Sequence, residues 1–421
     1  MADAALPQYT DEPDEASDGV GLARRAAERR RHFTVTLDLY MVITVGALLA
    51  IGLMMVWSTT FFLDSNSSTA YFFQQVRSML VGAVIMFALS AIDYRVWRRL
   101  AIPLMGAIVT SLVAVLVVGA LILNARRTLF AGAVQPSEPA KVIVVIYMAA
   151  WLSSKQGKIR NLTYGLLPFA VLVGIVGGLI ILEPDLSTAA LILIASAVMF
   201  FLAGADWLQM GITGVVFVAV GAFAITHIPY AALRLQSWLD VIRDPVQAHA
   251  SHAQNVIIAF LNGGLTGVGL GGGYQKFYNL SVPHSDSIFA VIGEELGLVG
   301  CALVVGLYVV FMLRGYRIAR LAPDRFGALL ASGITTLIMI QALYNIASMA
   351  TIVPLAGVPL PFISFGGSSL VTVMAGVGLL LSVSRGTAKQ ATLAGAQRAI
   401  ARILDFGGRD GRRRLSSAGR R

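Results

Sequence analysis

The chain has 421 residues and a formal net charge of +10, from 32 Lys and Arg against 22 Asp and Glu. Only 13% of its residues are charged and 57% are hydrophobic, whereas soluble domains carry about 25% charged and 45–50% apolar residues. This composition excludes an ordinary cytosolic enzyme. It also excludes disorder over most of the length, because disorder requires low hydrophobicity. The single cysteine, Cys301, excludes a disulfide framework and every multi-cysteine metal site.

Apolar segments of about 20 residues predict membrane-spanning helices. Six clear segments are 39–58, 101–123, 164–182, 208–228, 287–313 and 328–350, and four weaker ones are 78–92, 142–153, 187–203 and 369–384. The segment 142–153 is too short to cross alone, and it reaches a sufficient length only if Glu138 and Lys141 are buried in protein. The sequence therefore predicts an all-α, polytopic membrane helix bundle of about ten transmembrane helices.

The distribution of Lys and Arg predicts the orientation of these spans. With both tails inside, 25 of the 32 basic residues lie on the inner side and seven on the outer side. This asymmetry is what the positive-inside rule requires. We expect cytoplasmic tails at 1–32 and 386–421, the second one flexible and basic, around a membrane domain at 33–385. One large extracytoplasmic loop, 229–286, separates spans seven and eight, and we expect amphipathic stretches in it.

Ionisable side chains gather at the predicted outer ends of the spans, where such costly groups indicate function. They are Arg126, Arg127, Glu138, Lys141, Glu183, Asp185, His284, Asp286, Glu294 and Glu295. Structural roles stay open for several of them: an internal ion pair for Glu294 and Glu295, a helix cap for Asp185, and an interface anchor for the arginine pair. The run GVGLGG at 267–272 matches a dinucleotide fingerprint only formally, because no strand precedes it; a tightly packed or flexible loop is expected instead.

Five longer motifs follow one another along the chain. They are ARR with QPSEPAK (125–141), PDLST with FLAG (184–204), GVGLGGGYQK (267–276), HSDSIFAVIGEELGLVG (284–300) and GVPLPFISFGGSSL (357–370). In these motifs the chain resembles the SEDS family (shape, elongation, division and sporulation) over about 39–385. Its members include the division protein FtsW and the elongation protein RodA. The phrase GVPLPF favours the elongation branch, whereas the early STTFFLD stretch and the basic tails favour the division branch, which we prefer; a role in elongation stays open.

The resemblance implies a peptidoglycan glycosyltransferase of the bacterial cytoplasmic membrane. Such an enzyme polymerises lipid II into glycan strands at the outer face and releases undecaprenyl pyrophosphate. The resemblance further implies that Asp286 is catalytic. The expected partners are a class B penicillin-binding protein, which crosslinks the strands, and other divisome or elongasome membrane proteins, with no nucleic acid; the division septum is the expected location.

The chemistry of the residues agrees with this activity. Transfer needs a base for the attacking sugar hydroxyl, which one carboxylate can supply, and cations for the leaving pyrophosphate. We expect Glu138 to orient Lys141 or an arginine. The expected substrate-binding residues are Arg126, Arg127, Glu138, Lys141, His284, Lys276 and Ser368. No dedicated metal site is expected, although a divalent cation, Mg²⁺ or Mn²⁺, could bridge Asp286 and the pyrophosphate.

Two other functions stay open from the sequence. A lipid II transporter is compatible with ten spans, but its path should carry polar groups towards both faces of the membrane, whereas the inner halves of these spans are nearly bare of charge. A scaffold that recruits the penicillin-binding protein is the second alternative.

Overall fold

The computed structural model describes residues 38–61, 65–118, 120–122, 125–128, 135–155, 157–243, 252–278, 280, 282–354 and 357–416. The chain divides into two compact units, and the first of them, 37–387, contains every site discussed below. The expected tail at 1–32 lies outside the described residues.

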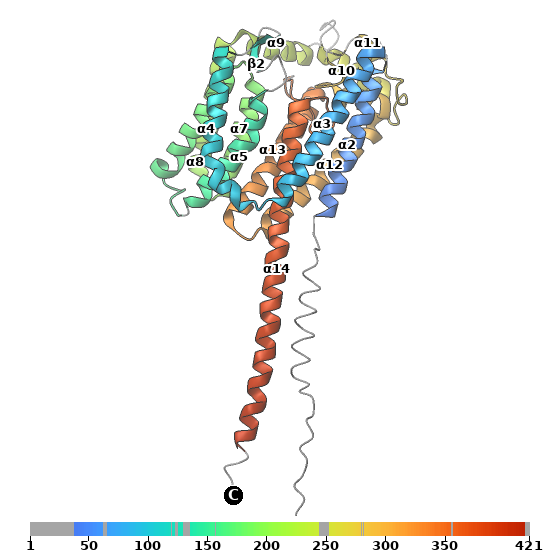
Figure 1. Ribbon diagram of the computed structural model, residues 1–421. Helices are drawn as coiled ribbons and strands as arrows, with labels where there is room; N and C mark the ends of the chain where they lie inside the picture. Colours follow the sequence, from blue (N-terminus) through green and yellow to red (C-terminus); the bar gives the residue numbers. More distant parts are fainter. Residues whose placement is uncertain are drawn as a thin grey trace, which may run out of the picture. The chain divides into compact units, whose positions relative to one another are not determined.

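The first unit is a bundle of helices with one small hairpin (Figure 1). Up to the long loop the helices are α2 (Leu39–Thr60), α3 (Ser65–Ala91), α4 (Arg95–Val118), α5 (Ser137–Ser154), α6 (Leu167–Leu182), α7 (Leu186–Leu202) and α8 (Trp207–His227). A π-helical turn, Leu162–Leu166, leads into α6. The later helices are α9 (Pro229–Arg243), α10 (His252–Gly263), α11 (Gln275–Tyr278), α12 (Ile288–Leu321), α13 (Arg325–Met349) and α14 (Gly367–Ser416), the last of which belongs to this unit only up to residue 387.

Each predicted span coincides with a helix, and the all-α membrane bundle is confirmed. Among the described residues, eight helices are long and apolar enough to cross a membrane, and α7 is a shorter apolar helix. The number ten stays a prediction. Helix α5 does extend through Glu138 and Lys141, and both side chains are buried, as its short apolar run required.

Two boundaries differ from the prediction. The third span was expected to reach residue 123, but α4 ends at Val118 and the chain then forms β1 (Ala120–Ile122), because its backbone pairs with β2 (Ala125–Thr128) in an antiparallel hairpin. The segment 386–416, expected to be a flexible tail, continues α14 as a helix. Its many Ala, Arg and Leu residues are strong helix formers.

Aspartate side chains fix the starts of several helices, because the first amides of a helix have no partner within it. Asp38 accepts a hydrogen bond from the Met41 amide at the start of α2. Asp185 does the same for Thr188 in α7, which confirms the expected cap in the EPDLST turn. Asp324 likewise caps α13 through the Gly327 amide.

Helix α13 is the centre of the bundle. In its most apolar stretch 83% of the residues are buried inside the protein, against 17% for α8. It packs against α12, α5 and α7, whereas α8 presents most of its apolar surface outward, as a helix in contact with lipid does. Polar groups on α13 are therefore enclosed by protein on nearly all sides.

The described parts of the long loop 229–286 contain three helices. Helices α9, α10 and α11 lie at the same end of the bundle as β2, at the top of Figure 1. Helices α10 and α11 both contact α12. The segment expected to carry amphipathic stretches therefore covers one end of the bundle.

Helix α12 is broken at Gly297, which adopts φ +65° and ψ −166°. The glycine-rich run fills the break, because the amides of Val268 and Gly269 donate to the carbonyls of Glu294 and Glu295, and the amide of Leu298 donates to the carbonyl of Gly264. A Cβ on Gly267 would lie 2.1 Å from the Glu295 carbonyl oxygen. The tight-packing interpretation of this run is confirmed, and its glycines are required by this close approach.

Candidate active site

Asp286 lies in a turn between the long loop and α12, at the wall of a cavity of about 490 Å³. The cavity is enclosed by α9, the start of α10, the end of α13 and the loop that precedes α14. Its polar lining residues are Arg234, Ser237, Trp238, His252, Asp286, Ser287, Ser348 and Thr351. The motifs at 284–300 and 357–370 therefore meet at one cavity.

The turn that carries Asp286 is fixed by α13 and by the loop 357–366. Asn345 donates its side-chain amide to the carbonyls of Asp286, at 2.9 Å, and Val358, at 2.7 Å. Ser364 donates to the Ser285 carbonyl at 2.7 Å, and the Phe365 amide donates to the His284 carbonyl at 2.9 Å. These bonds hold the carboxylate at a defined position, which is what a catalytic group requires.

Arg234 of α9 faces the same point as the Asp286 carboxylate. A Cβ built on Gly357 would lie 3.2 Å from Asp286 Oδ2 and 3.3 Å from Arg234 Nη2. Burial raises the pKa of Asp286, while the Ser285 hydroxyl, 3.0 Å from Oδ1, and the Arg234 charge partly offset that rise. The result is a carboxylate more basic than an exposed aspartate, with a guanidinium beside it.

Two histidines flank this turn. His252 Nε2 lies 3.1 Å from the Ser287 hydroxyl, and burial lowers the pKa of His252. The His284 ring packs between Tyr71, at 5.0 Å between ring centroids, and Phe365, at 5.5 Å. Burial lowers the pKa of His284 as well. Both rings are therefore neutral near pH 7, and the substrate contact expected for His284 stays a prediction.

Glu138 and Lys141 form a buried ion pair within α5. Lys141 Nζ lies 2.9 Å from Glu138 Oε2 and 3.1 Å from Gln341 Oε1. Gln341 in turn donates to the Pro359 carbonyl at 2.9 Å, two residues from Gly357 in the loop that fixes Asp286. Glu138 is thus in place to orient Lys141, and their substrate contacts stay a prediction.

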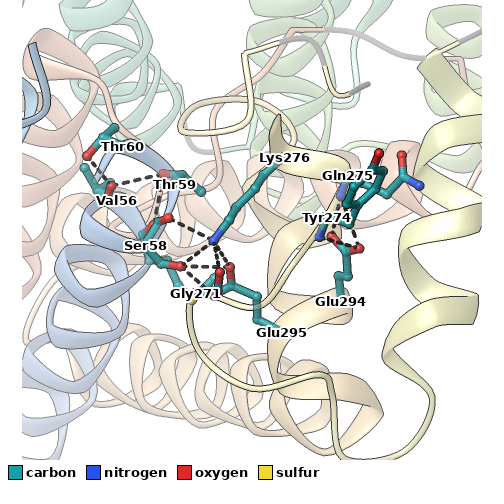
Figure 2. A network of polar contacts seen from close by, with 11 residues as sticks. Val56, Ser58, Thr59, Thr60, Gly271, Tyr274, Gln275, Lys276, Glu294 and Glu295 are labelled. Carbon is teal, nitrogen blue, oxygen red and sulfur yellow. Dashed lines mark hydrogen bonds and ion pairs between the residues drawn. The ribbon is translucent and has the colours of Figure 1, made fainter. Parts of the chain in front are cut away.

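Lys276 was expected to bind substrate, but its ammonium group lies in the protein interior (Figure 2). It is 2.6 Å from Glu295 Oε1, and neither side chain is exposed. It also donates to the carbonyls of Ser58 and Gly271, each at 3.0 Å. The internal ion pair considered for Glu295 is therefore observed. These contacts favour a structural role for Lys276, and its substrate contact stays a prediction without support from this geometry.

The neighbouring Glu294 faces backbone rather than a cation. Its carboxylate accepts hydrogen bonds from the amides of Tyr274 and Gln275 at 3.0 and 3.2 Å (Figure 2). Both glutamates of the GEELG motif thus attach the segment 271–276 to α12.

The other expected site residues lie elsewhere. Arg126 and Arg127 belong to β2, and their side chains lie outside the described part of the structure. Ser368 is half-buried near the start of α14. Within the described residues no group of three or more His, Cys, Asp or Glu is placed to hold a metal ion.

Sequence reasoning missed four residues of this site, namely Arg234, His252, Gln341 and Asn345. Gln341 and Asn345 are polar, lie four residues apart in an apolar span and so share one helix face; that signal was available. Arg234 and His252 belong to α9 and α10, and only the folding of the long loop brings them to Asp286.

Comparison with known proteins agrees with the motifs. Residues 38–389 match the family of FtsW, RodA and SpoVE, described as "Cell cycle protein". The chain is 36% identical over 356 residues to a probable peptidoglycan glycosyltransferase FtsW of Trichlorobacter lovleyi, covering 83% of this chain and 93% of that protein. It is also 36% identical over 355 residues to the stage V sporulation protein E of Bacillus subtilis, covering 83% and 97%.

Solved structures have the same fold. The rod shape determining protein RodA of Thermus thermophilus superposes with a TM-score of 0.61 at 29% identity, covering 82% of this chain and 95% of that chain. A chain from a study of polymerization and crosslinking by a peptidoglycan synthase complex gives a TM-score of 0.67 at 28% identity, covering 82% and 97%. The chain belongs to the FtsW, RodA and SpoVE family of membrane proteins.

Proposed function

We propose that the chain is a peptidoglycan glycosyltransferase that polymerises lipid II at the outer face of the cytoplasmic membrane, in cell division. The observation that carries the proposal is the Asp286 carboxylate, which burial makes more basic and which lines a cavity with Arg234, on a backbone whose carbonyl accepts a hydrogen bond from Asn345. Membership of the family, and relatives named as probable peptidoglycan glycosyltransferases FtsW, support it.

The reaction needs one base and a stabilised leaving group. The Asp286 carboxylate takes the proton of an acceptor sugar 4-hydroxyl as that oxygen attacks the anomeric carbon of the donor. The new C–O bond forms while the bond from the anomeric carbon to the pyrophosphate breaks, and undecaprenyl pyrophosphate leaves with the electron pair. The proton then passes from Asp286 to water. Because pyrophosphate is a stable anion, no second carboxylic acid is required, unlike in most glycoside hydrolysis.

Two cations are proposed to serve the leaving group, one at the wall of the cavity and one buried in α5. Arg234 lies beside Asp286, and Lys141 is held by Glu138 and Gln341. Charge-assisted hydrogen bonds from such groups stabilise the negative charge that develops on pyrophosphate. A divalent cation that arrives with the substrate would find one carboxylate, Asp286, at this wall of the cavity.

The proposed partner is a class B penicillin-binding protein, which would crosslink the strands as they form. The structural likeness to a chain from a peptidoglycan synthase complex supports a partner of this kind. In the proposed orientation both termini are cytoplasmic, and the cavity opens to the outer face near the division septum.

Polymerisation of lipid II by the purified protein tests this function, with and without the partner. We expect wild type to form polymer, and Asp286→Asn to lose polymerisation while it folds and binds lipid II normally. Asp240→Asn, which removes an exposed carboxylate from α9, is the matched control and should keep full activity. Full activity of Asp286→Asn would refute the site. Flipping of lipid II in vesicles by a wild type that never forms polymer would favour a transporter instead.

A further inference from the structure

Two apolar hollows join into one groove on the side of the bundle formed by α6, α7 and α8. The first has a volume of about 400 Å³ and the second about 330 Å³. Both are lined by Ile181, Leu193, Phe217 and Val220, so they are continuous. The groove runs from the π-helical turn before α6 to α9. Apart from Thr213 and Ser187, its walls between these ends are apolar or glycine.

Arg234 stands where this groove meets the cavity of Asp286. It lines the outer hollow of the groove together with Ala231 and Leu235 of α9 and Tyr344 of α13. It also lines the Asp286 cavity, and it is the residue shared by the two. A long apolar channel therefore ends at a guanidinium, and the carboxylate lies just beyond that guanidinium.

We infer that this groove holds the polyprenyl chain of the glycosyl donor and that Arg234 binds the donor's pyrophosphate. The inference rests on the proposed function. The groove and Arg234 together are chemically complementary to such a ligand, which joins a long hydrocarbon chain to a compact anion. The apolar walls suit the chain, and the guanidinium suits the pyrophosphate.

The position of Arg234 distinguishes the donor from the acceptor. In the donor, the pyrophosphate is bonded to the anomeric carbon under attack, so it must lie close to the base. In the acceptor, the reacting 4-hydroxyl is separated from its own pyrophosphate by two sugar rings. A guanidinium that approaches the same point as Asp286 is therefore placed for the donor's pyrophosphate.

Glycines of the groove allow it to be filled without disturbing the fold. Gly178 of α6 and Gly221 of α8 line the groove, and a Cβ at either position meets no atom within 4 Å. Leucine is also a better helix former than glycine, so Gly178→Leu and Gly221→Leu should fold at least as well as wild type. Gly306→Leu in α12, equally free of contacts and outside the groove, is the matched control.

Binding of undecaprenyl pyrophosphate to the purified protein in nanodiscs tests the groove without any catalysis. Each leucine would take up volume that the chain fills, and overfilling the groove should weaken binding by about tenfold in Gly178→Leu and Gly221→Leu, while Gly306→Leu binds like wild type. Arg234→Gln should lower the preference for undecaprenyl pyrophosphate over undecaprenyl monophosphate by about tenfold, and Arg234→Lys should restore part of it.

A lipid II whose GlcNAc 4-hydroxyl is methylated acts only as a donor, and it tests the assignment. We expect the leucine variants to raise KM for this donor and to leave KM for the acceptor unchanged. If both leucine variants bound undecaprenyl pyrophosphate with wild-type affinity, the assignment of the groove to the polyprenyl chain would be overturned. The same would follow if phosphatidylglycerol competed for the site as well as undecaprenyl pyrophosphate does. An effect on acceptor KM alone would overturn the donor assignment. If wild type binds the pyrophosphate as expected but never forms polymer, the proposed function fails while the binding result stands.

Discussion

Removal of the Lys276 ammonium group should destabilise the protein severely, and Lys276→Met is the sharpest form of this test. The ammonium is 2.6 Å from Glu295 Oε1, and both side chains are fully enclosed. Methionine keeps the length of the stem and removes the charge. Glu295 would then lose this cation and keep the hydrogen bond from the Ser58 hydroxyl, which donates to its two carboxylate oxygens at 2.6 to 2.8 Å.

The size of the effect follows from this enclosure. Breaking a buried ion pair by removing one partner costs about 3–5 kcal/mol, because the other charge stays buried without compensation. The double variant Lys276→Met with Glu295→Gln buries no charge and should recover much of that loss. Lys155→Met, which removes an exposed lysine, should change the free energy of unfolding by less than about 0.5 kcal/mol.

The free energy of unfolding can be measured in mixed micelles with increasing SDS. The same preparations should be assayed for lipid II polymerisation, because the two readouts separate the two roles considered for Lys276. A Lys276→Met protein as stable as wild type but inactive would refute the structural role and favour the substrate contact. A double variant no more stable than the single one would contradict the charge argument.

Three further predictions concern the loop, the carboxylate and the cap of α13. Gly267→Ala places a Cβ 2.1 Å from a carbonyl oxygen and should prevent stable folding, whereas Gly264→Ala, with φ +51° and open space, should cost about 1–2 kcal/mol; equal losses of thermal stability would contradict the packing argument. Because burial raises the pKa of Asp286 while Arg234 lowers it, activity should rise with pH through a value above the usual aspartate pKa. Arg234→Gln should shift this rise in the pH–rate profile to higher pH, and a rise at an unchanged pH would count against the pairing of Asp286 with Arg234. Although burial by itself raises the pKa of Asp324, hydrogen bonds from Tyr94, the Gly327 amide and Arg95 lower it overall. Asp324→Ala should therefore cost about 0.5–2 kcal/mol near neutral pH, and its deficit relative to wild type should shrink as unfolding is measured at pH values falling through the folded pKa.

Local features of the sequence determined the class of the fold, and the resemblance of its motifs to a known family suggested the central residue of the candidate site. The need for long apolar helices in a membrane is a local requirement, so ten helices could be placed from hydropathy, including α5 with its buried Glu138 and Lys141. The cap at Asp185 follows from short-range chemistry. The HSD motif identified Asp286, which stays the candidate base.

Only the tertiary structure decided which polar groups meet. Ser58 and Glu295 are 237 positions apart and nevertheless share a hydrogen bond, and no periodicity in the sequence reports such a contact. Arg234 reaches Asp286 because α9 folds across the end of the bundle, and Lys276 is withdrawn from the site because the glycine-rich loop enters the break in α12. The physical reason is that burial and pairing of charges depend on the packing of distant elements, whereas the spans themselves depend on local hydrophobicity.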